Sequence, residues 1–384
     1  MKWETYKLKQ LCSEIVDCVN KTAPTSDVPT PYKMLRTSDI RDGKINLENL
    51  NCVTKEVYEK WTRRGKLQKG DVIFTREAPL GEVGLVREEK NYFLGQRLVL
   101  FRANNKMCDG RFLMYSLLWR DNKQAIISKG VGSTVAHLRV PECENIEIKV
   151  PDLDVQHRIA DILSAYDDLI ENNQKQIKLL EEAAQRLYKE WFVDLRFPGH
   201  ENTKIVDGVP EGWHRGTIGQ IAEFKRGRTI TKAQVKEGNV PVIAGGLEPA
   251  YYHNVANTKA PVITISASGA NAGFVRLYGV DVFASDCSFV DGLGTESLFF
   301  VYEFLKESKV SIDQLQKGSA QPHVYAKDIN AMKITIPEKE YLERFDRYAK
   351  VYFNKIKTLQ GQNERLKTAR DLLLPKLMSG EAEV

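Results

Sequence analysis

Two long stretches of the chain repeat apolar residues every three or four positions. The first runs from about Val155 to Leu195, and the second follows Pro337. Apolar residues at this spacing lie along one face of a helix, as in the seam of a coiled coil. The predicted seam positions are Tyr166, Leu169, Asn173, Ile177 and Leu180 in the first helix, and Ile356, Leu359, Asn363 and Leu366 in the second.

Each stripe carries one asparagine near its middle, Asn173 in the first helix and Asn363 in the second. A buried asparagine in a helical seam lowers stability but fixes register and partner. We therefore expect the two helices to pack on each other in antiparallel orientation, with the asparagines near their crossing. At 1.5 Å per residue the first helix would be about 60 Å long, whereas a domain of about 150 residues has a radius of gyration of only ~15 Å. This length favours a spacer over the simpler alternative, a helix that only closes its own domain.

A glycine-containing loop and then a short alternating strand precede each helix. The loops hold His137 and His323, the strands end at Pro151 and Pro337, and the members of both pairs lie 186 positions apart. Upstream in each half, an apolar run, a glycine turn and a second apolar run are typical of two strands joined by a turn. Internal similarity at a fixed offset indicates a repeated structural unit. The chain is therefore predicted to hold two copies of one fold.

The predicted fold class is α+β, with two similar mixed α/β domains joined by two long antiparallel helices and an approximate internal two-fold repeat. A length of 384 residues suits two domains of ~150 residues each with connecting structure. The expected boundaries are a first domain over 1–151, a first long helix over 152–196, a linker over 197–212, a second domain over 213–337 and a second long helix over 338–384.

The composition is that of a folded protein, with 42% hydrophobic residues and a formal net charge of +5. This charge suits a nucleic-acid partner without requiring one. The amino end does not resemble a signal peptide and no apolar run approaches the ~20 residues of a membrane span, so we expect a cytoplasmic protein. The six cysteines form no C-x-x-C pair, and no histidine stands at metal-ligand spacing from them, which predicts reduced thiols without a metal.

Three further segments, taken together, connect the chain to a known family. They are Arg186–Asp194 at the end of the first helix, Val209–Trp213 at the start of the second domain and Leu372–Glu381 at the carboxyl end. In this order, on a duplicated frame, they make the whole chain resemble the specificity subunit of a type I restriction-modification system. Gln156 is similar to the family's usual glutamine at the helix start. The second copy departs from that pattern, because the offset of 186 places Leu342 there.

The resemblance implies a non-enzymatic DNA-binding subunit. Each globular domain would be a target-recognition domain that reads one half of a bipartite, asymmetric sequence in double-stranded DNA, while the helices set the gap. The partners implied are two modification subunits, which methylate adenine at N6 with S-adenosylmethionine, and two motor-nuclease restriction subunits, which use ATP and Mg²⁺. No cofactor, metal or membrane is expected for this chain. The sequence holds neither a G-x-x-x-x-G-K-[ST] phosphate loop, nor a G-x-G-x-x-G fingerprint, nor an adenine-methylase motif.

The sequence also allows two other functions, a nuclease and a stand-alone DNA-binding protein. Asp121, Glu147 and Lys149 imitate the spacing of a nuclease site that holds Mg²⁺. The offset of 186 places Lys333 and Thr335 at the positions of Glu147 and Lys149, so the second copy lacks such a site and a self-sufficient nuclease is not favoured. A stand-alone DNA-binding regulator, or an antirestriction decoy built on the same frame, stays open.

Candidate DNA contacts fall into three groups. The glycine loops combine lysines for phosphate with short polar side chains for base edges; the alternative is a turn whose serine caps the backbone and whose histidine packs inward. Basic clusters beside predicted turns are suited to phosphates, although many such clusters are only solvated. A small-residue loop lets the backbone approach DNA and offers an asparagine for adenine. The loop candidates are Lys129, Ser133, His137, Lys317, Ser319, Gln321 and His323. The basic candidates are Arg63, Arg64, Lys66, Arg76, Lys225, Arg226, Arg228 and Lys232, and the small-residue loop adds Ser268 and Asn271.

Large apolar side chains gather at the ends of the two helices. Trp191, Phe192, Leu373 and Leu374 are expected to bury against something larger than their own helix, and we predict that they dock the modification subunits. The alternative is a purely internal two-helix core.

Overall fold

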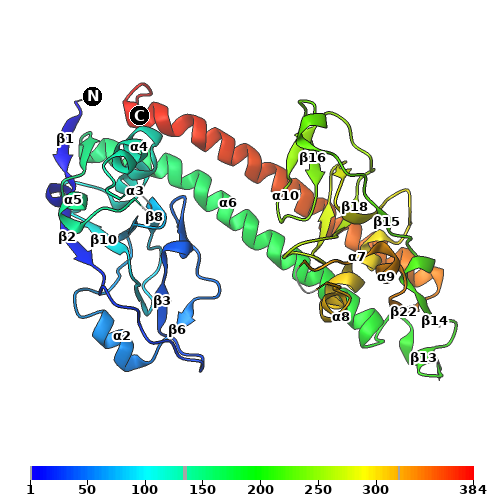
Figure 1. The fold of residues 1–384 in the computed structure, drawn as a ribbon. Coiled ribbons are helices and arrows are strands. Elements are labelled where there is room, and N and C mark those ends of the chain that lie inside the picture. The colour runs from blue at the N-terminus through cyan, green and yellow to red at the C-terminus, as the bar shows by residue number, and fades with distance from the viewer. Residues whose placement is uncertain (1, 133–135, 319–320) are drawn as a thin grey trace. The chain divides into compact units, whose positions relative to one another are not determined.

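The computed structural model describes residues 2–132, 136–318 and 321–384. The chain forms two compact units: unit 1 comprises Met1–Ile170 and Glu364–Val384, and unit 2 comprises Glu171–Asn363. Two long helices, α6 (Leu153–Tyr188) and α10 (Lys339–Ser379), each contribute one part to each unit (Figure 1). Each unit therefore combines a globular domain with a segment of both helices.

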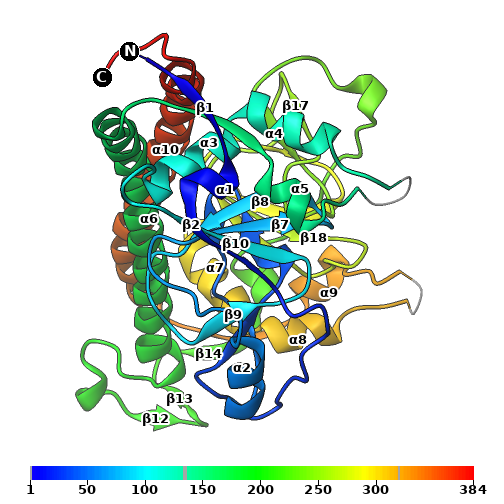
Figure 2. The same ribbon diagram turned by 90° about the vertical axis from the view of Figure 1, so that its left-hand side faces the viewer.

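An antiparallel four-stranded sheet with the order β2-β10-β7-β8 forms the centre of unit 1 (Figure 2). Alternate residues of a strand point to opposite faces of the sheet, and both faces are covered here. Phe74 and Phe101 belong to one buried cluster, whereas Ile73 and Leu100 belong to another. Burial on both faces explains why β7 and β10 are nearly continuous apolar runs. The four strands are β2 (Cys12–Asp17), β7 (Val72–Arg76), β8 (Leu80–Leu85) and β10 (Leu98–Ala103).

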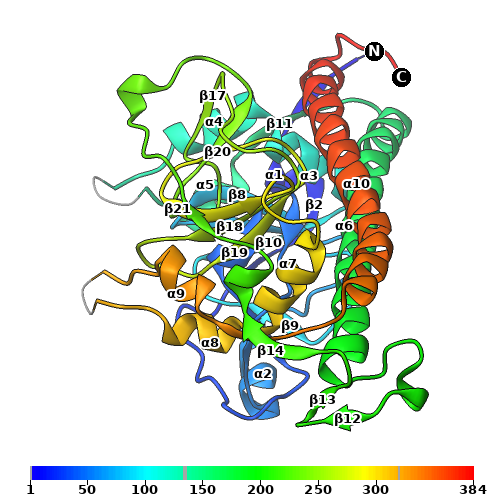
Figure 3. The same cartoon turned by 90° about the vertical axis from the view of Figure 1, so that its right-hand side faces the viewer.

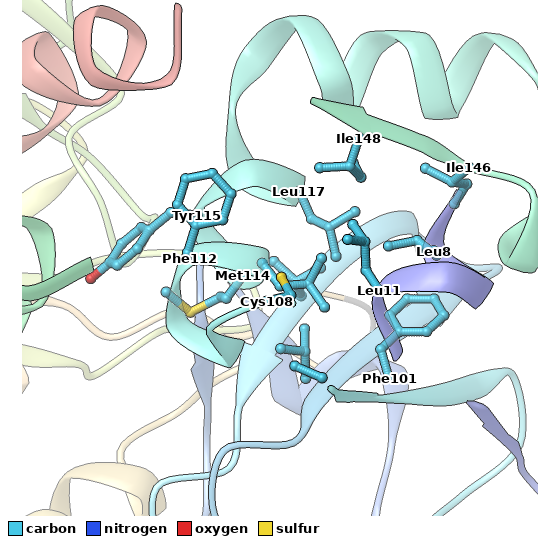
Figure 4. Packing of buried hydrophobic residues seen from close by; sticks show 14 of the residues in the cluster. Leu8, Leu11, Phe101, Cys108, Phe112, Met114, Tyr115, Leu117, Ile146 and Ile148 are labelled. Carbon is cyan, nitrogen blue, oxygen red and sulfur yellow. The ribbon is translucent and has the colours of Figure 1, made fainter. Parts of the chain in front are cut away.

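Helix α3 (Gly110–Leu118) covers one face of this sheet and supplies much of the core. The helix begins after Asp109, whose carboxylate accepts hydrogen bonds from the backbone N–H groups of Arg111 and Phe112 at 2.7 and 3.1 Å, as expected of an N-cap. Figure 4 shows side chains from α3, β10, the amino-terminal segment and the strand before α6 pointing toward one another. Each large apolar side chain buried in this way stabilises the fold by roughly 1.5–3 kcal/mol.

The other elements of unit 1 surround this centre. β1 pairs antiparallel with β11, and β3 lies between β6 and the parallel strand β9. The elements are β1 (Glu4–Lys7), α1 (Leu8–Leu11), β3 (Lys33–Leu35), β4 (Ile40–Arg41), β5 (Lys44–Ile45), β6 (Asn51–Cys52), α2 (Lys55–Trp61), β9 (Tyr92–Leu94), α4 (Arg120–Ser128), α5 (Val140–Glu144) and β11 (Glu147–Val150).

Unit 2 repeats this topology. Its four-stranded sheet has the order β15-β21-β18-β19 with α7 (Leu298–Glu307) against it (Figure 3). β14 pairs antiparallel with β22, and β16 lies between β17 and the parallel strand β20. The strands are β12 (Ile205–Val206), β13 (Val209–Pro210), β14 (His214–Thr217), β15 (Lys225–Arg226), β16 (Val240–Ile243), β17 (Tyr251–His253), β18 (Val262–Ser266), β19 (Val275–Tyr278), β20 (Phe283–Ala284), β21 (Cys287–Asp291) and β22 (Lys333–Ile336), and the short helices are α8 (Lys309–Gln314) and α9 (Ala326–Asn330).

Three sheets correspond between the units. Each unit has a four-stranded antiparallel sheet, a three-stranded sheet with one parallel pair, and a two-stranded pair in which β1 or β14 joins the strand before a long helix. The hairpin β4–β5 belongs to unit 1 alone among the described residues. The predicted α+β fold with two similar domains and two long helices is confirmed. The segment predicted as a linker, 197–212, contains the small hairpin β12–β13.

The long helices are antiparallel in both units. In unit 2 the Asn173 side-chain amide donates a hydrogen bond of 2.9 Å to the Asn363 side-chain carbonyl, and the rings of Tyr188 and Phe345 meet with centroids 6.0 Å apart. In unit 1 the start of α6 shares a core with Leu377, near the end of α10. The predicted asparagine contact is confirmed, and the buried seam also includes the predicted positions Ile356 and Leu359.

The seam of α6 in unit 1 differs from the prediction at one position. Leu169 is 46% exposed, and Asp167 and Ile170 take the buried positions around it. An aspartate is tolerated there because the Tyr115 hydroxyl donates to its carboxylate at 2.5 Å and the Arg370 guanidinium forms an ion pair with it. The apolar stripe concealed this polar contact, so Leu169 was wrongly placed in the seam.

The two long helices begin in different ways. In unit 1 the buried Gln156 amide donates to the backbone carbonyls of Met107 and Pro151 at 3.0 and 2.9 Å and accepts from the Asp109 N–H at 3.1 Å. In unit 2 the Asp346 carboxylate of α10 instead accepts from two N–H groups of the first turn of α7, at 3.2 and 2.9 Å. Both arrangements fasten the long helix to the start of the helix that covers the sheet. Asp346 therefore makes the connection in unit 2 that Gln156 makes in unit 1, and no glutamine is needed there.

Candidate nucleic-acid interface

The two glycine loops are held by the same backbone contacts in both units. In unit 1 Val131 and His137 exchange two backbone hydrogen bonds of 3.0 Å, and in unit 2 Lys317 and His323 exchange bonds of 2.9 and 2.8 Å. The residue after each histidine then donates its N–H to the end of a sheet strand, to Arg76 at the end of β7 in unit 1 and to Ala267 just after β18 in unit 2, at 3.0 Å in both cases. Each unit thus brings a glycine loop and a strand-to-strand turn together into one surface, which we call the loop pair.

The predicted loop residues occupy these loop pairs. His137 and His323 are half-buried, and Lys129, Lys317 and Gln321 are exposed. The backbone contacts of the two histidines fit the structural interpretation of the loop, and contacts of their rings with DNA remain a prediction. Gly318 has a positive φ of 98°, so a side chain would be strained there. Ser133 and Ser319 lie outside the described residues.

The predicted basic cluster of unit 1 divides into exposed cations and an internal anchor. Arg63 and Lys66 are exposed, and Arg64 donates to the Asp17 carboxylate at 3.3 Å. The Arg76 side chain is only 16% exposed, because its guanidinium donates to Asp17 at 3.0 Å and to the backbone carbonyl of Leu138 at 3.3 Å. Arg76 therefore fastens the glycine loop to the sheet, and its prediction as a DNA contact is corrected. The role of Asp17 could not be predicted from the sequence, because only the fold brings it close to Arg64 and Arg76.

Unit 2 has a similar carboxylate beside its loop pair. Asp286 accepts from the Arg226 guanidinium at 2.8 Å and from the Ser268 hydroxyl. The Asn271 amide donates to the backbone carbonyl of Gly245 at 3.4 Å, so both predicted residues of the small-residue loop are engaged within the unit. The remaining predicted cations, Lys225, Arg228 and Lys232, are exposed, and their contacts with phosphate remain a prediction. Asp286, like Asp17, was missed from the sequence.

The residues predicted to dock partner subunits lie in the chain's own cores. Trp191 is 6% exposed in unit 2, where its ring meets Phe345 edge-on at 6.2 Å and the Arg344 guanidinium lies over it at 5.8 Å. Phe192 packs in the same cluster, at 4.8 Å from the ring of Phe300. Leu373 and Leu374 pack against the core of unit 1. The internal-core alternative therefore describes the buried Trp191, whereas Phe192, Leu373 and Leu374 are half-buried and their docking role remains a prediction.

The cysteines and the possible metal ligands of the described residues do not form a further site. The six cysteines are free thiols, and burial raises the pKa of Cys12, Cys143 and Cys287 to about 12. No group of three or more His, Cys, Asp or Glu side chains within the described ranges is arranged to hold a metal ion. Among the helices of that same part of the chain, none combines the length and the apolar character needed to cross a bilayer.

Comparisons with known proteins agree with this duplicated architecture. The profile of the type I restriction modification DNA specificity domain matches residues 1–182 and 210–368. The chain is 27% identical to the type I restriction enzyme MjaIX specificity subunit of Methanocaldococcus jannaschii over 82% of its own length and 78% of that protein. It is 22% identical to the HindI specificity subunit of Haemophilus influenzae over 90% and 93%.

The solved structure of the S subunit of a type I restriction-modification system from M. genitalium has the same fold. It superposes with a TM-score of 0.64 at 20% identity, over 98% of this chain and 96% of that one. The two domain matches cover most of the sequence. The chain belongs to the family of type I restriction-modification DNA specificity subunits and carries two target-recognition domains.

Proposed function

We propose that this chain is the non-catalytic specificity subunit of a type I restriction-modification complex and that its two domains read the two halves of a bipartite, asymmetric DNA target. One observation carries the proposal: the same loop pair, held by the same backbone hydrogen bonds, occurs once in each unit with different side chains around it. A repeated frame with differing side chains suits two binding sites of one kind for two different sequences.

The exposed cations of both units would provide sequence-independent attraction to DNA. Arg63 and Lys66 in unit 1 and Lys225, Arg228 and Lys232 in unit 2 are all exposed. Binding of phosphates by such groups releases counterions, so affinity should fall steeply as salt rises. The bases themselves would be read by side chains of the loop pairs.

Catalysis would belong to partner subunits. Two modification subunits using S-adenosylmethionine and two restriction subunits using ATP and Mg²⁺ would complete the complex, and this chain would bind no cofactor. Because the four residues predicted to dock partners also pack on the chain's own cores, we propose that exposed apolar side chains of the long helices extend the docking surface. These include Leu179, Val351 and Leu372.

The long helices would set the gap between the half-sites. Two domains that read grooves on one face of a duplex need half-site centres about one helical turn, ~34 Å, apart. Insertion of one helical turn next to Asn173 should then change the preferred gap and leave both half-sites unchanged. Changed half-sites with an unchanged gap would contradict this spacer role.

The test is to map methylated adenines in cells that express this chain with its modification partner. A split, asymmetric motif that disappears when the chain is deleted would support the proposal, and a methylation pattern independent of the chain would refute it. Co-purification separates the alternatives. A specificity subunit should carry a methyltransferase with it, whereas a stand-alone regulator or an antirestriction decoy should not, and a self-sufficient nuclease would cut DNA with Mg²⁺ alone.

A further inference from the structure

The loop pairs of the two units lead into equivalent short helices. Helix α5 begins at Val140 and helix α9 at Ala326, and the residues before them, Arg139 and Tyr325, are 186 positions apart. Both lie two residues after the histidine that anchors its loop. Arg139 and Tyr325 therefore occupy the same place in the repeated frame.

The chemistry at this place differs between the units. In unit 2 the Tyr325 ring is stacked on the His323 ring, with centroids 6.0 Å apart and an angle of 15° between their planes. The ammonium groups of Lys317 and Lys327 lie 6.0 and 5.9 Å from the centroid of Tyr325, and that of Lys317 also forms an ion pair with the Asp328 carboxylate at 2.8 Å. In unit 1 the Arg139 side chain is 74% exposed and meets only the Glu142 carboxylate at 3.4 Å among the described ion pairs.

Tyr325 is not needed for the core of its own domain. Its neighbour Val324 and the α9 residue Ile329 are both buried in the main cluster of unit 2, whereas Tyr325 is 39% exposed. An exposed aromatic ring, backed by a second ring and flanked by the Lys327 ammonium and the Lys317–Asp328 ion pair, offers an apolar surface with a cation at its side (α9 is labelled in Figure 3). This combination matches the sugar–phosphate backbone of DNA, where deoxyribose rings alternate with anionic phosphates.

We infer that the stacked pair His323–Tyr325 is a backbone contact of the second target-recognition domain, in which Tyr325 packs on a deoxyribose while Lys327 meets the adjoining phosphate. The first domain uses the Arg139 guanidinium at the equivalent place to bind a phosphate. This inference rests on the proposed function. It adds that the two domains bind the duplex through different side chains at one equivalent position of the repeat. Since both contacts are to the backbone, they position the domains without changing the sequence that is read.

The two contacts predict different salt dependences. Truncation of Arg139→Ala removes one phosphate contact, so the slope of log affinity against log salt should become less steep by about 0.9. Truncation of Tyr325→Ala removes an uncharged contact, so affinity should fall about tenfold, equivalent to ~1.4 kcal/mol, while the slope stays unchanged. Tyr325→Phe retains the ring and should bind like the wild type. Leu293→Ala, at a residue that is 82% exposed elsewhere in unit 2, controls for truncation as such.

The experiment measures fluorescence anisotropy of the complex of this chain with its modification subunit on two labelled duplexes. One carries the methylated motif and the other a scrambled version, and both are titrated across a range of salt. An equal loss of affinity on both duplexes for Tyr325→Ala, with an unchanged motif in cells, is the expected result. Unchanged affinity, or a changed motif, would overturn the inference while leaving the proposed function intact. A wild-type complex that does not bind DNA would refute the proposed function itself, and the inference with it.

Discussion

The Asn173 side chain donates its 2.9 Å hydrogen bond to Asn363 inside an otherwise apolar seam of unit 2. Both amides are at most 5% exposed. The pair satisfies one donor and one acceptor that would otherwise be buried without a partner, and it fixes which turns of the two helices meet.

Replacing one member of this pair should therefore destabilise the protein more than replacing both. Asn173→Leu leaves the Asn363 amide buried and unpaired, at a cost of about 1–3 kcal/mol in the free energy of unfolding. The double variant with leucine at both positions should recover most of that loss. Urea-induced unfolding of the two single variants and the double variant measures the coupling. Asn172→Leu, at the exposed neighbouring residue, is the matched control. Additive single and double effects would contradict the role of the pair.

Stability should fall with rising pH because of Glu303 on α7. This side chain is 3% exposed, and burial raises the pKa of its carboxyl group to about 8. A carboxyl whose folded pKa is raised favours folding when protonated, so its contribution is present below pH ~4.5 and is lost as pH rises toward 8. Glu303→Gln should match the wild type near pH 5 and exceed it at pH 9 by up to about 4 kcal/mol. Thermal unfolding across pH tests this, with the exposed Glu296→Gln as control. A constant difference between variant and wild type would argue against the buried acid.

Gln156→Leu should show what the glutamine contributes, because leucine is the residue that the second copy carries at the equivalent place. The substitution removes three hydrogen bonds and leaves the carbonyls of Met107 and Pro151 and the N–H of Asp109 without this partner. We expect a loss of about 2–4 kcal/mol. Amide hydrogen exchange should rise at the start of α3 and α6, with unit 2 unaffected. Arg158→Leu, on the exposed side of the same helix, should leave exchange unchanged.

Arg76 and Arg63 should respond differently to truncation. Arg76→Ala breaks the link from Asp17 to the Leu138 carbonyl, so the melting temperature should drop along with DNA affinity. Arg63→Ala should leave the melting temperature unchanged and make the salt slope of DNA binding less steep by about 0.9. Calorimetry and anisotropy on the same samples separate the two cases. An Arg76→Ala variant with a normal melting temperature but weakened DNA binding would instead show that Arg76 contacts DNA directly.

The architecture was predictable where it depends on periodicity and repetition. Apolar spacing predicted both long helices, and the constant offset between His137 and His323 predicted two copies of one domain. The seam was displaced at Leu169 because hydrophobicity cannot show that Asp167 is neutralised by Tyr115 and Arg370, which come from distant parts of the chain.

The candidate interface was less predictable, for a related reason. A basic residue has the same appearance in the sequence whether it faces solvent or, like Arg76, is held by Asp17. Trp191 was assigned to a partner because its ring exceeds what one helix can cover, and the structure shows that Phe345 and neighbouring rings of the same unit cover it. Tyr325 was not predicted as a DNA contact. Its proposed role depends on the stacking of its ring on His323 and on the comparison with Arg139 at the equivalent place in unit 1.

The core of unit 1 contains Leu377 and Met378 together with Leu8 and Leu11. Residues separated by almost the whole length of the chain must therefore meet before the amino-terminal domain is fully packed. During synthesis the strands of this domain leave the ribosome before α10, which completes the core, has been translated. The nascent protein would thus expose the apolar side chains that pack on Leu377 and Met378 until α10 is made, a period in which chaperones or a second nascent copy have access to them.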